Sequence, residues 1–385
     1  MFINFWYAAQ WSDQVGSQPL KLRMLGQDFV LWRDSAGAVH CLANVCAHRG
    51  GSLAGGRLRG DCIECPYHGW LFDGDGRCRK IPSLGPQGQA RIPGRARVDS
   101  YPVEERYGLV HVFLGDLPAE ERPPIMEIPE YGQPGWYASC EDSIGQGDFR
   151  RAVENGLDPA HNEYVHPTHG FSGTREDYFV PELNIEEQPW GSGFITTYFS
   201  PPLKDASMQQ ASGRSENAVI EAGTFHHGPT CMITRIRPTA QYAINQNSFK
   251  TPIDELSSRS FLIQTRNFLQ GPEHDARFRE RNAVVRNQDV VVLADLEPKF
   301  TPETNAHELL MPADRAVARY REWLKAWEAR GWRIDTARVA RERPYKTCVI
   351  PGPARRAEPK GWVLDAVPMV AAHAIGATDA VARQG

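Results

Sequence analysis

The first 114 residues carry short apolar runs of strand length, separated by turns. Residues 29–32, 39–42 and 109–114 are examples, each with aromatic or β-branched side chains. Such runs favour β-strands because they are too short for helices and are bounded by turn residues. The pattern predicts an all-β domain over residues 1–118.

A segment of different composition follows this domain. Residues 115–136 read GDLPAEERPPIMEIPEYGQPGW, in which proline, glutamate and glycine dominate. Proline and glycine end strands and disfavour helices, so we expect a linker at 119–136.

Beyond the linker, strand and helix patterns are mixed. We expect strands at 195–199, 219–222, 231–236 and 259–263, and helices at 150–165, 279–296 and 315–330. The last helix stops at Gly331, and its predicted buried face consists of Val317, Tyr320, Leu324 and Trp327. The chain is thus predicted to be an α+β protein with a second domain at 137–360 and a C-terminal tail at 361–385.

The overall charge excludes some classes of partner. The 385 residues carry 43 Lys and Arg against 47 Asp and Glu, a formal net charge of −4, with no long run of one sign. This balance argues against nucleic-acid binding and gives no sign of a membrane patch. No apolar run of about eighteen residues is present to span a bilayer, and the first residues, MFINFWYAAQW, do not resemble a signal peptide.

Two Cys–His pairs have the spacing of an iron–sulfur or metal site. Cys46-Ala-His48 and Cys65-Pro-Tyr-His68 both lie among glycines. A Rieske [2Fe–2S] cluster needs two cysteines on one iron and two histidines on the other, so each loop would give one ligand to each iron. A four-ligand zinc site is the alternative, but such sites usually keep their cysteines together and their histidines together. The other six cysteines show no disulfide framework, so we expect a cytoplasmic protein.

A second polar group lies at 155–167, which read NGLDPAHNEYVHP. On a helix, Asp158 and His161 would share a face. Pro167 would end the helix near His166 and leave that side chain free to turn back. Two imidazoles and a carboxylate form the facial triad of non-haem Fe(II) oxygenases, with open positions for O₂ and substrate. A helix end with solvated histidines is the alternative interpretation.

The helical pattern at 281–296 contains a candidate for the missing carboxylate. At about 100° per residue, Asp289 lies within an apolar sector formed by Val285, Val292, Leu293 and Leu296. A buried unpaired carboxylate is costly, so Asp289 is expected to meet a cation, which an Fe(II) held by the two histidines would supply. Asp295 is the rival, but it is turned about 240° away and lies near the helix end. We interpret His169 as a loop residue rather than a ligand.

These segments resemble a known family. CAHRGGSLAGG and CPYHGWLFDGDG are similar to the Rieske fingerprint of the Rieske non-haem iron oxygenases, and 155–167 resembles their mononuclear iron motif. RNQDVVVL at 286–293 resembles the helix that carries their third iron ligand. The likeness is to oxygenase α subunits of the vanillate O-demethylase and phenoxybenzoate dioxygenase type, which act alone as homotrimers. It implies an N-terminal all-β Rieske domain and a helix-grip catalytic domain, an antiparallel sheet with helices.

The resemblance also implies which residues hold the metals. The implied ligands of the [2Fe–2S] cluster are Cys46, His48, Cys65 and His68. The implied ligands of the mononuclear Fe(II) are His161, His166 and Asp289.

Two further roles follow from the resemblance. Asp158 would accept the N–H groups of His68 in one subunit and His161 in the next, and so connect the two metal centres. Asn155 matches an asparagine that some members place three residues before the aspartate. Others place it four before, where this chain has Glu154.

The implied protein is a terminal oxygenase that needs partners. No GxGxxG fingerprint is present, so electrons would come from a separate NAD(P)H-dependent reductase, with or without a ferredoxin. With O₂, the enzyme would hydroxylate, dihydroxylate or O- or N-dealkylate a small aromatic substrate, carboxylated or not. Arg235 and Arg237 are candidates for binding a carboxylate. The expected pocket residues are Phe199, Phe225, Met232, Ile233, Phe249, Phe261 and Phe268. The alternative is an electron-transfer or redox-sensing module without oxygenase activity.

Overall fold

The computed structural model describes residues 1–214 and 218–372, which form two compact units. Unit 1 contains Met1–Ile125, Thr251–Asp254 and the described residues from Trp327 onward. Unit 2 contains Glu255–Ala326 and the described residues of Met126–Lys250. The predicted domain boundaries remain predictions, and residues 373–385 of the predicted tail lie outside the described part of the chain.

The segment after residue 327 packs in unit 1, whereas the sequence pattern grouped it with the second domain. Aromatic packing is the reason. The ring of Trp327 lies edge-to-face against Phe5 at 5.0 Å and against Phe2 at 6.3 Å. In addition, the Tyr101 hydroxyl donates a 2.6 Å hydrogen bond to the carbonyl of Ile350. The C-terminal segment therefore contributes to the core of unit 1.

Unit 1 is built mainly from short strands, as the sequence predicted. One sheet has the order β1 (Phe5–Trp11), β11 (Leu109–Leu114), β10 (Val103–Arg106). A second has the order β2 (Leu20–Met24), β3 (Gln27–Arg33), β4 (Val39–Ala43), β9 (Ser100–Tyr101). A third has the order β5 (Arg57–Arg59), β6 (Cys62–Glu64), β7 (Leu71–Phe72), β8 (Cys78–Lys80). The smaller elements are α1 (Gly85–Gly88), α7 (Thr336–Glu342), α8 (Pro353–Ala357) and the parallel pair β20 (Cys348–Val349) and β21 (Asp365–Ala366).

Unit 2 is an eight-stranded sheet with helices. The strand order is β12 (Tyr137–Gln146), β19 (Ser257–Arg266), β18 (Ile244–Pro252), β17 (Cys231–Arg237), β16 (Ala218–His227), β14 (Gly191–Gly193), β13 (Glu186–Gln188). β15 (Thr196–Ser200) pairs with β16. The pairs β12–β19, β16–β17 and β17–β18 are antiparallel. This architecture confirms the predicted fold class, an all-β domain followed by an antiparallel sheet with helices.

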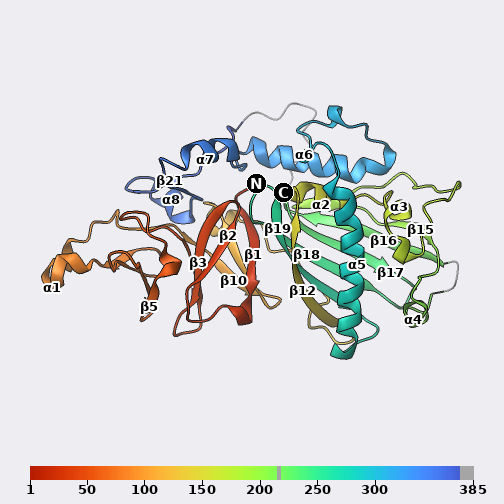
Figure 1. Ribbon diagram of the computed structural model, residues 1–385, viewed down its shortest axis with the longest axis horizontal. Coiled ribbons are helices and arrows are strands. Elements are labelled where there is room, and N and C mark those ends of the chain that lie inside the picture. Colours follow the sequence, from red (N-terminus) through yellow and green to blue (C-terminus); the bar gives the residue numbers. More distant parts are fainter. Residues whose placement is uncertain (215–217, 373–385) are drawn as a thin grey trace. The chain divides into compact units, whose positions relative to one another are not determined.

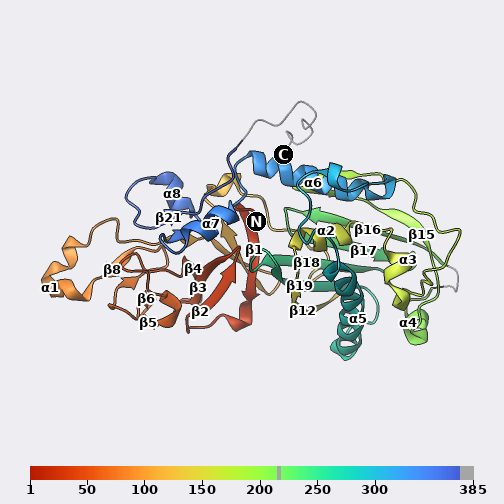
Figure 2. The same ribbon diagram turned by 45° about the horizontal axis from the view of Figure 1, so that its top comes forward.

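One long helix covers a face of this sheet. α5 (Asp275–Ala294) lies across the strands in both views and contacts β12, α2 (Phe149–Gly156) and α3 (Asn162–Val165) (Figures 1 and 2). The remaining helices are α4 (Ala206–Ala211) and α6 (Arg315–Ala329). α5 and α6 agree with the predicted helices at 279–296 and 315–330.

The predicted helix at 150–165 is wrong, because α2 and α3 are separate. Proline disfavours helical geometry at the residue before it, and Pro159 follows Asp158. The Asp158 carboxylate instead accepts a 2.7 Å hydrogen bond from the backbone N–H of Ala160. Asp158 and His161 therefore do not share a helix face, although the turn keeps them close.

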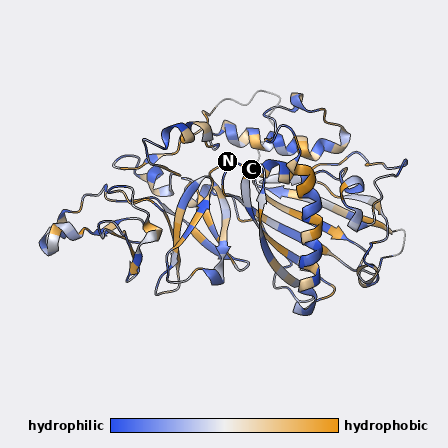
Figure 3. Cartoon of the chain, viewed as in Figure 1, coloured by the Kyte–Doolittle hydropathy of each residue, from blue (hydrophilic) through white to orange (hydrophobic). Residues whose placement is uncertain are grey.

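The predicted apolar sector on α5 is only partly buried. Asp275 and Phe278 are the residues of α5 that are fully buried, while Val292 is 45% exposed. Hydrophobic residues occupy several sides of the last turns of α5 (Figure 3). The side chain of Asp289 is 21% exposed, so it faces a cavity rather than a closed core.

Candidate metal centres

The two Cys–His loops have matching backbone turns. The Cys46 carbonyl accepts a 2.9 Å hydrogen bond from the N–H of Gly50, and the Cys65 carbonyl accepts one of 3.0 Å from Gly69. Both glycines have positive φ, 73° and 69°, which other residues rarely adopt. A Cβ on Gly51 would lie 3.1 Å from Sγ of Cys65, so the first loop passes close to the second thiol. The loops thus form a cradle that leaves little room for side chains.

The thiols and the imidazoles of this cradle differ in their exposure to solvent. Cys46 and Cys65 are buried, while His48 and His68 are exposed. The Nδ1 atoms of the two histidines lie 3.1 Å apart, so both rings turn the same nitrogen toward one point. Burial, with a smaller contribution from Cys65, raises the pKa of Cys46 to about 12. A bound cation is what would keep this thiol ionised at neutral pH, and two sulfurs with two Nδ1 atoms fit a Rieske cluster.

Aromatic rings flank the two histidines. The Trp70 ring stacks on His48 at a centroid distance of 4.7 Å and an interplanar angle of 5°. The Tyr67 ring lies 3.8 Å from that of His68. These contacts restrict the rotation of both imidazoles, so the two Nδ1 atoms stay aimed at the same point.

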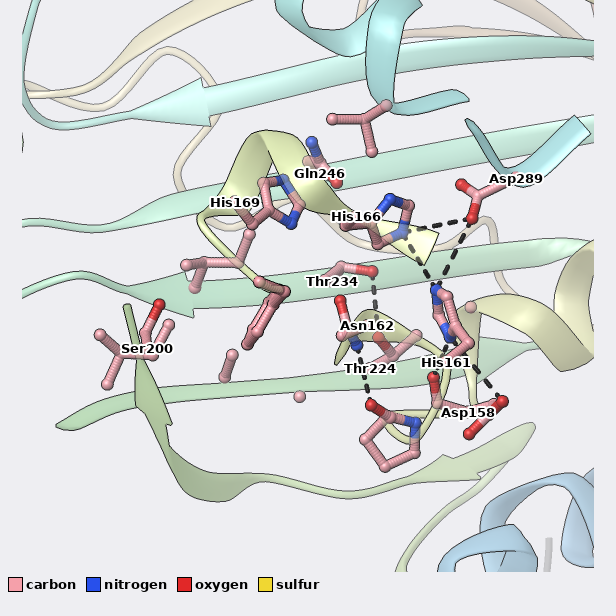
Figure 4. A pocket seen from close by; sticks show the side chains of 18 of the residues that line it. Asp158, His161, Asn162, His166, His169, Ser200, Thr224, Thr234, Gln246 and Asp289 are labelled. Atoms are coloured by element: carbon pink, nitrogen blue, oxygen red, sulfur yellow. Dashed lines mark hydrogen bonds and ion pairs between the residues drawn. The ribbon is translucent and has the colours of Figure 1, made fainter. Parts of the chain in front are cut away.

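In unit 2, three polar groups converge between α3 and α5. His166 Nε2 lies 3.2 Å from Asp289 Oδ1 and 3.1 Å from His161 Nε2, and His161 Nε2 lies 3.6 Å from the same carboxylate oxygen. One ligand atom from each residue falls within 4.8 Å of the others. Figure 4 shows the three side chains pointing toward one another at one end of a pocket. Two imidazole nitrogens and one carboxylate oxygen fit the facial triad of a mononuclear iron.

Other groups fix the orientation of both imidazoles. His166 Nδ1 lies 3.0 Å from Gln288 Oε1, which also accepts a 3.1 Å hydrogen bond from the Thr168 hydroxyl. His161 Nδ1 lies 2.6 Å from the Asp158 carbonyl and 3.8 Å from its carboxylate. Because these acceptors place the proton on Nδ1, each Nε2 keeps its lone pair for a metal. Gln288 is part of the segment that resembles the family's third-ligand helix, but the sequence assigned it no role, since a glutamine on a helix surface carries no metal-binding signature of its own.

The charge of Asp289 depends on its neighbours. Burial alone would raise the pKa of this carboxyl, but His166 and a side-chain hydrogen bond with Asn155 hold it below its ordinary value. Asn155 therefore lies beside the triad. Glu154 does not, because its carboxylate is buried against Arg321 with contacts of 2.8 and 2.9 Å.

The triad opens into a cavity of about 230 Å³. The larger apolar side chains of its lining are Phe171, Phe194, Leu203, Ile220, Ile236 and Val285. None of the seven predicted apolar lining residues is among the residues that line this cavity; Phe199 lines a neighbouring one. His169 lines the cavity, and burial, ahead of the nearby Arg281, lowers its pKa to about 3.

The arginines of β17, which the sequence offered as candidates for binding a carboxylate, face away from the cavity. Thr234 and Ile236 line it, and successive strand residues point to opposite faces. Arg235 lies over the ring of Phe225 at 5.3 Å, and Arg237 pairs with Glu221 at 3.5 Å. The alternation of side chains along β17 was predicted correctly, but the sequence pattern did not show which face of the strand lines the cavity.

Comparison with known proteins identifies the family. A Rieske [2Fe-2S] domain model matches residues 5–102, and a vanillate O-demethylase oxygenase C-terminal domain model matches residues 146–330. The iron-sulfur subunit TsaM1 of the toluene-4-sulfonate monooxygenase system of Comamonas testosteroni is 31% identical over 288 residues, 70% of this chain and 80% of the relative. The chain belongs to the Rieske non-haem iron oxygenases.

Other relatives of this Rieske oxygenase act on different molecules. The 4beta-methylsterol monooxygenase of Methylococcus capsulatus is 37% identical over 283 residues, 70% of this chain and 69% of the relative. Dicamba monooxygenase bound to 3,6 dichlorosalicylic acid shares the fold, with a TM-score of 0.70 and 24% identity over 86% of this chain and 98% of that one. Fold and family therefore leave the substrate open.

As a Rieske oxygenase, the protein is an enzyme with two cofactors, a [2Fe–2S] cluster and a mononuclear iron. It is the terminal component of a multicomponent system and depends on reductase or ferredoxin partners for electrons. The matched oxygenase domain argues against an electron-transfer module, and the matched Rieske domain argues against zinc. Within the described residues, no helix is both long and apolar enough to cross a membrane.

Proposed function

We propose that the oxygenase holds its iron with His161, His166 and Asp289. The observation that carries this assignment is the convergence of two Nε2 atoms and one carboxylate oxygen within 4.8 Å. The matching assignment for the cluster is Cys46, His48, Cys65 and His68, supported by the two facing Nδ1 atoms. When bound, the cluster supplies single electrons and the iron activates O₂.

The reaction we propose is hydroxylation or demethylation of a small aromatic compound. The apolar wall of the cavity would hold an aromatic ring and exclude water from the triad. Near the triad, Asn155 would orient Asp289, and Gln288 would keep His166 in the tautomer that can bind a metal. Relatives named for toluene-4-sulfonate, phenoxybenzoate and 5,5'-dehydrodivanillate support an aromatic substrate.

The proposed assembly is a cytoplasmic homotrimer in which Asp158 links metal centres of neighbouring subunits. Because the Nδ1 atoms of His48 and His68 face each other, their Nε2 atoms are left for other contacts, and both rings are exposed. The Asp158 carboxylate is 27% exposed and lies 3.8 Å from His161 Nδ1. A carboxylate can accept N–H groups from two imidazoles at once, which an amide oxygen does less well. None of the eight cysteines, all of which lie in the described part of the chain, forms a disulfide, which supports a reducing compartment.

Metal analysis and spectroscopy of anaerobically purified protein test this function. We expect three irons per chain and a rhombic Rieske signal in electron paramagnetic resonance. Cys65→Ser should abolish the red-brown colour, whereas Asp158→Asn should keep both metal centres and slow electron transfer between them by orders of magnitude. A full visible spectrum in Cys65→Ser, or normal transfer in Asp158→Asn, would overturn the corresponding assignment.

A further inference from the structure

One segment of unit 1 carries only positive charge. Residues 77–97 contain six cations and no Asp or Glu, although the whole chain has a formal net charge of −4. The six are Arg77, Arg79, Lys80, Arg91, Arg95 and Arg97. Neutral residues separate most of them, so they form no continuous run, and it is the fold that brings them together.

The segment folds back on itself as an antiparallel pair. β8 lies antiparallel to residues 95–97, and the N–H of Cys78 donates a 2.9 Å hydrogen bond to the carbonyl of Ala96. This register places Arg95 opposite Arg79. The two halves of the segment therefore hold their arginines next to each other.

A side chain closes the loop that follows β8. The Gln89 amide accepts a 3.0 Å hydrogen bond from the N–H of Ile81 and donates one of 3.0 Å to the carbonyl of the same residue. Because Ile81 directly follows Lys80, the chain that carries Arg91 returns to the end of β8 where Lys80 lies. Figures 1 and 2 show α1, the helix in this loop, at one end of unit 1. We call Lys80, Arg91 and Arg95 the basic patch.

The cations of the basic patch have no acidic partner. Asp73 pairs with Arg79, and Glu358 pairs with the two arginines at the ends of the segment. No ion pair or side-chain hydrogen bond joins the basic patch to another described residue, and its three side chains are exposed. Even when the exposed Asp75 of the preceding turn is counted, six cations against three carboxylates leave a net charge of +3.

The basic patch adjoins the loops that would hold the cluster. Lys80 is the register partner of Leu71 on β7, and Leu71 directly follows Trp70, whose ring stacks on a histidine of the first loop. The loop after β8 also touches the second cluster loop, since a Cβ on Gly69 would lie 3.1 Å from the Pro82 ring. A protein bound at the basic patch would therefore stand close to the cluster.

The composition of this surface fits a transient partner. Within residues 77–97, Leu84 is the one large apolar side chain that is exposed, at 39%. Permanent subunit interfaces have apolar cores, whereas complexes between redox proteins are small and depend on complementary charge. A surface with three unpaired cations and little apolar area matches the second kind.

We propose that the basic patch is the docking site for an acidic protein that delivers electrons to the cluster. This inference rests on the proposed function, which requires a separate electron donor, and it adds the charge of that donor and the place of contact. In each encounter the donor is oxidised by one electron and the [2Fe–2S] cluster is reduced by one. Opposite charges would steer the donor to the patch and raise the association rate by about tenfold or more at low ionic strength.

Stopped-flow reduction of the oxidised holoenzyme tests the proposal. The donor is flavodoxin hydroquinone, an acidic one-electron carrier, and the formation of its semiquinone is followed by absorbance under anaerobic conditions. For the triple variant Lys80→Gln/Arg91→Gln/Arg95→Gln, we expect the second-order rate constant to fall by about tenfold at low salt, and far less at high salt, because screening removes the steering. Reduced methyl viologen, a small cation, should reduce the variant no more slowly than the unmodified protein.

The triple variant Arg341→Gln/Arg343→Gln/Lys346→Gln is the matched control. It removes three exposed cations from another part of unit 1, at and after α7. Equal rates of the patch variant and the control with flavodoxin would overturn the proposal, and so would slower reduction of the patch variant by methyl viologen. A patch variant that loses the oligomeric state of the unmodified protein on gel filtration would assign this surface to subunit contacts instead. Failure of the oxygenase function would be seen separately, as a missing Rieske signal or missing mononuclear iron in the unmodified protein.

Discussion

Gln288→Leu should weaken iron binding without affecting the cluster. In the structure Gln288 Oε1 lies 3.0 Å from His166 Nδ1 and fixes the tautomer whose Nε2 faces Asp289. Loss of such a contact typically lowers metal affinity by about tenfold to a hundredfold. This corresponds to about 1.4–2.7 kcal/mol, somewhat more than the roughly 1 kcal/mol of an ordinary hydrogen bond. The substitution also removes the acceptor of the Thr168 hydroxyl, which destabilises the surroundings of His166 further.

An anaerobic titration of iron-depleted protein with Fe(II) measures this effect directly. Asn287→Leu is a suitable control, since Asn287 is the preceding residue of α5 and is exposed. We expect the control to bind Fe(II) like the unmodified protein, and both variants to keep the visible spectrum of the cluster. Equal iron affinity in both variants would refute the role assigned to Gln288.

Three further changes are predicted. Asp289→Ala should lose the mononuclear iron and keep the Rieske spectrum, whereas Asp295→Ala should retain both. Iron analysis of the two variants tests this, and the opposite pattern would contradict the assignment of Asp289. Arg321→Met removes the two closest contacts of the buried Glu154 carboxylate and leaves it only Arg151, at 3.6 Å. This change should lower the free energy of unfolding by about 1.5–3 kcal/mol in urea denaturation, and a change below about 0.5 kcal/mol would contradict this. Burial lowers the pKa of His226 to about 3. As pH falls below about 6.5, this histidine is therefore protonated in the unfolded state but stays neutral in the folded state. Its contribution to stability should therefore drop by about 2 kcal/mol between pH 6.5 and 5, and His226→Gln should remove that loss, as urea midpoints at the two pH values would show.

The cluster loops could be predicted in detail because their chemistry is local. Cys46 and His48 lie within three residues of each other, and glycines mark the turns, so spacing alone indicates the ligand geometry. The family comparisons confirmed the cofactor. Asp289 is different, since it lies more than a hundred residues from His166 in the sequence. The helical pattern and the family resemblance selected it over Asp295, and the structure brings it to 3.2 Å from His166.

Other features could not be predicted, because polar residues occupy buried or partly buried positions. β18 was missed since Asn245 and Asn247, which are buried on the sheet face away from the cavity, interrupt its apolar pattern. The amide of Asn247 instead donates a 3.0 Å hydrogen bond to the carbonyl of Ile263. Similarly, the inward arginines are Arg214 and Arg281, which lie on a loop and a helix, while the strand arginines point outward. Periodicity shows which residues share a face, but only the packing of the unit shows which face is inward.

The break between α2 and α3 is what allows the proposed iron site to form. A continuous helix would turn His161 and His166 well apart around its axis, because five residues correspond to about 500°. With the turn at Pro159, the Nε2 atoms of the two histidines instead approach to 3.1 Å. α5 then supplies both Asp289, the proposed third ligand, and Gln288, whose contact orients His166. Two short, weak helices and one long helix must therefore dock together before the triad exists, so we infer that iron binding and the packing of α5 stabilise each other.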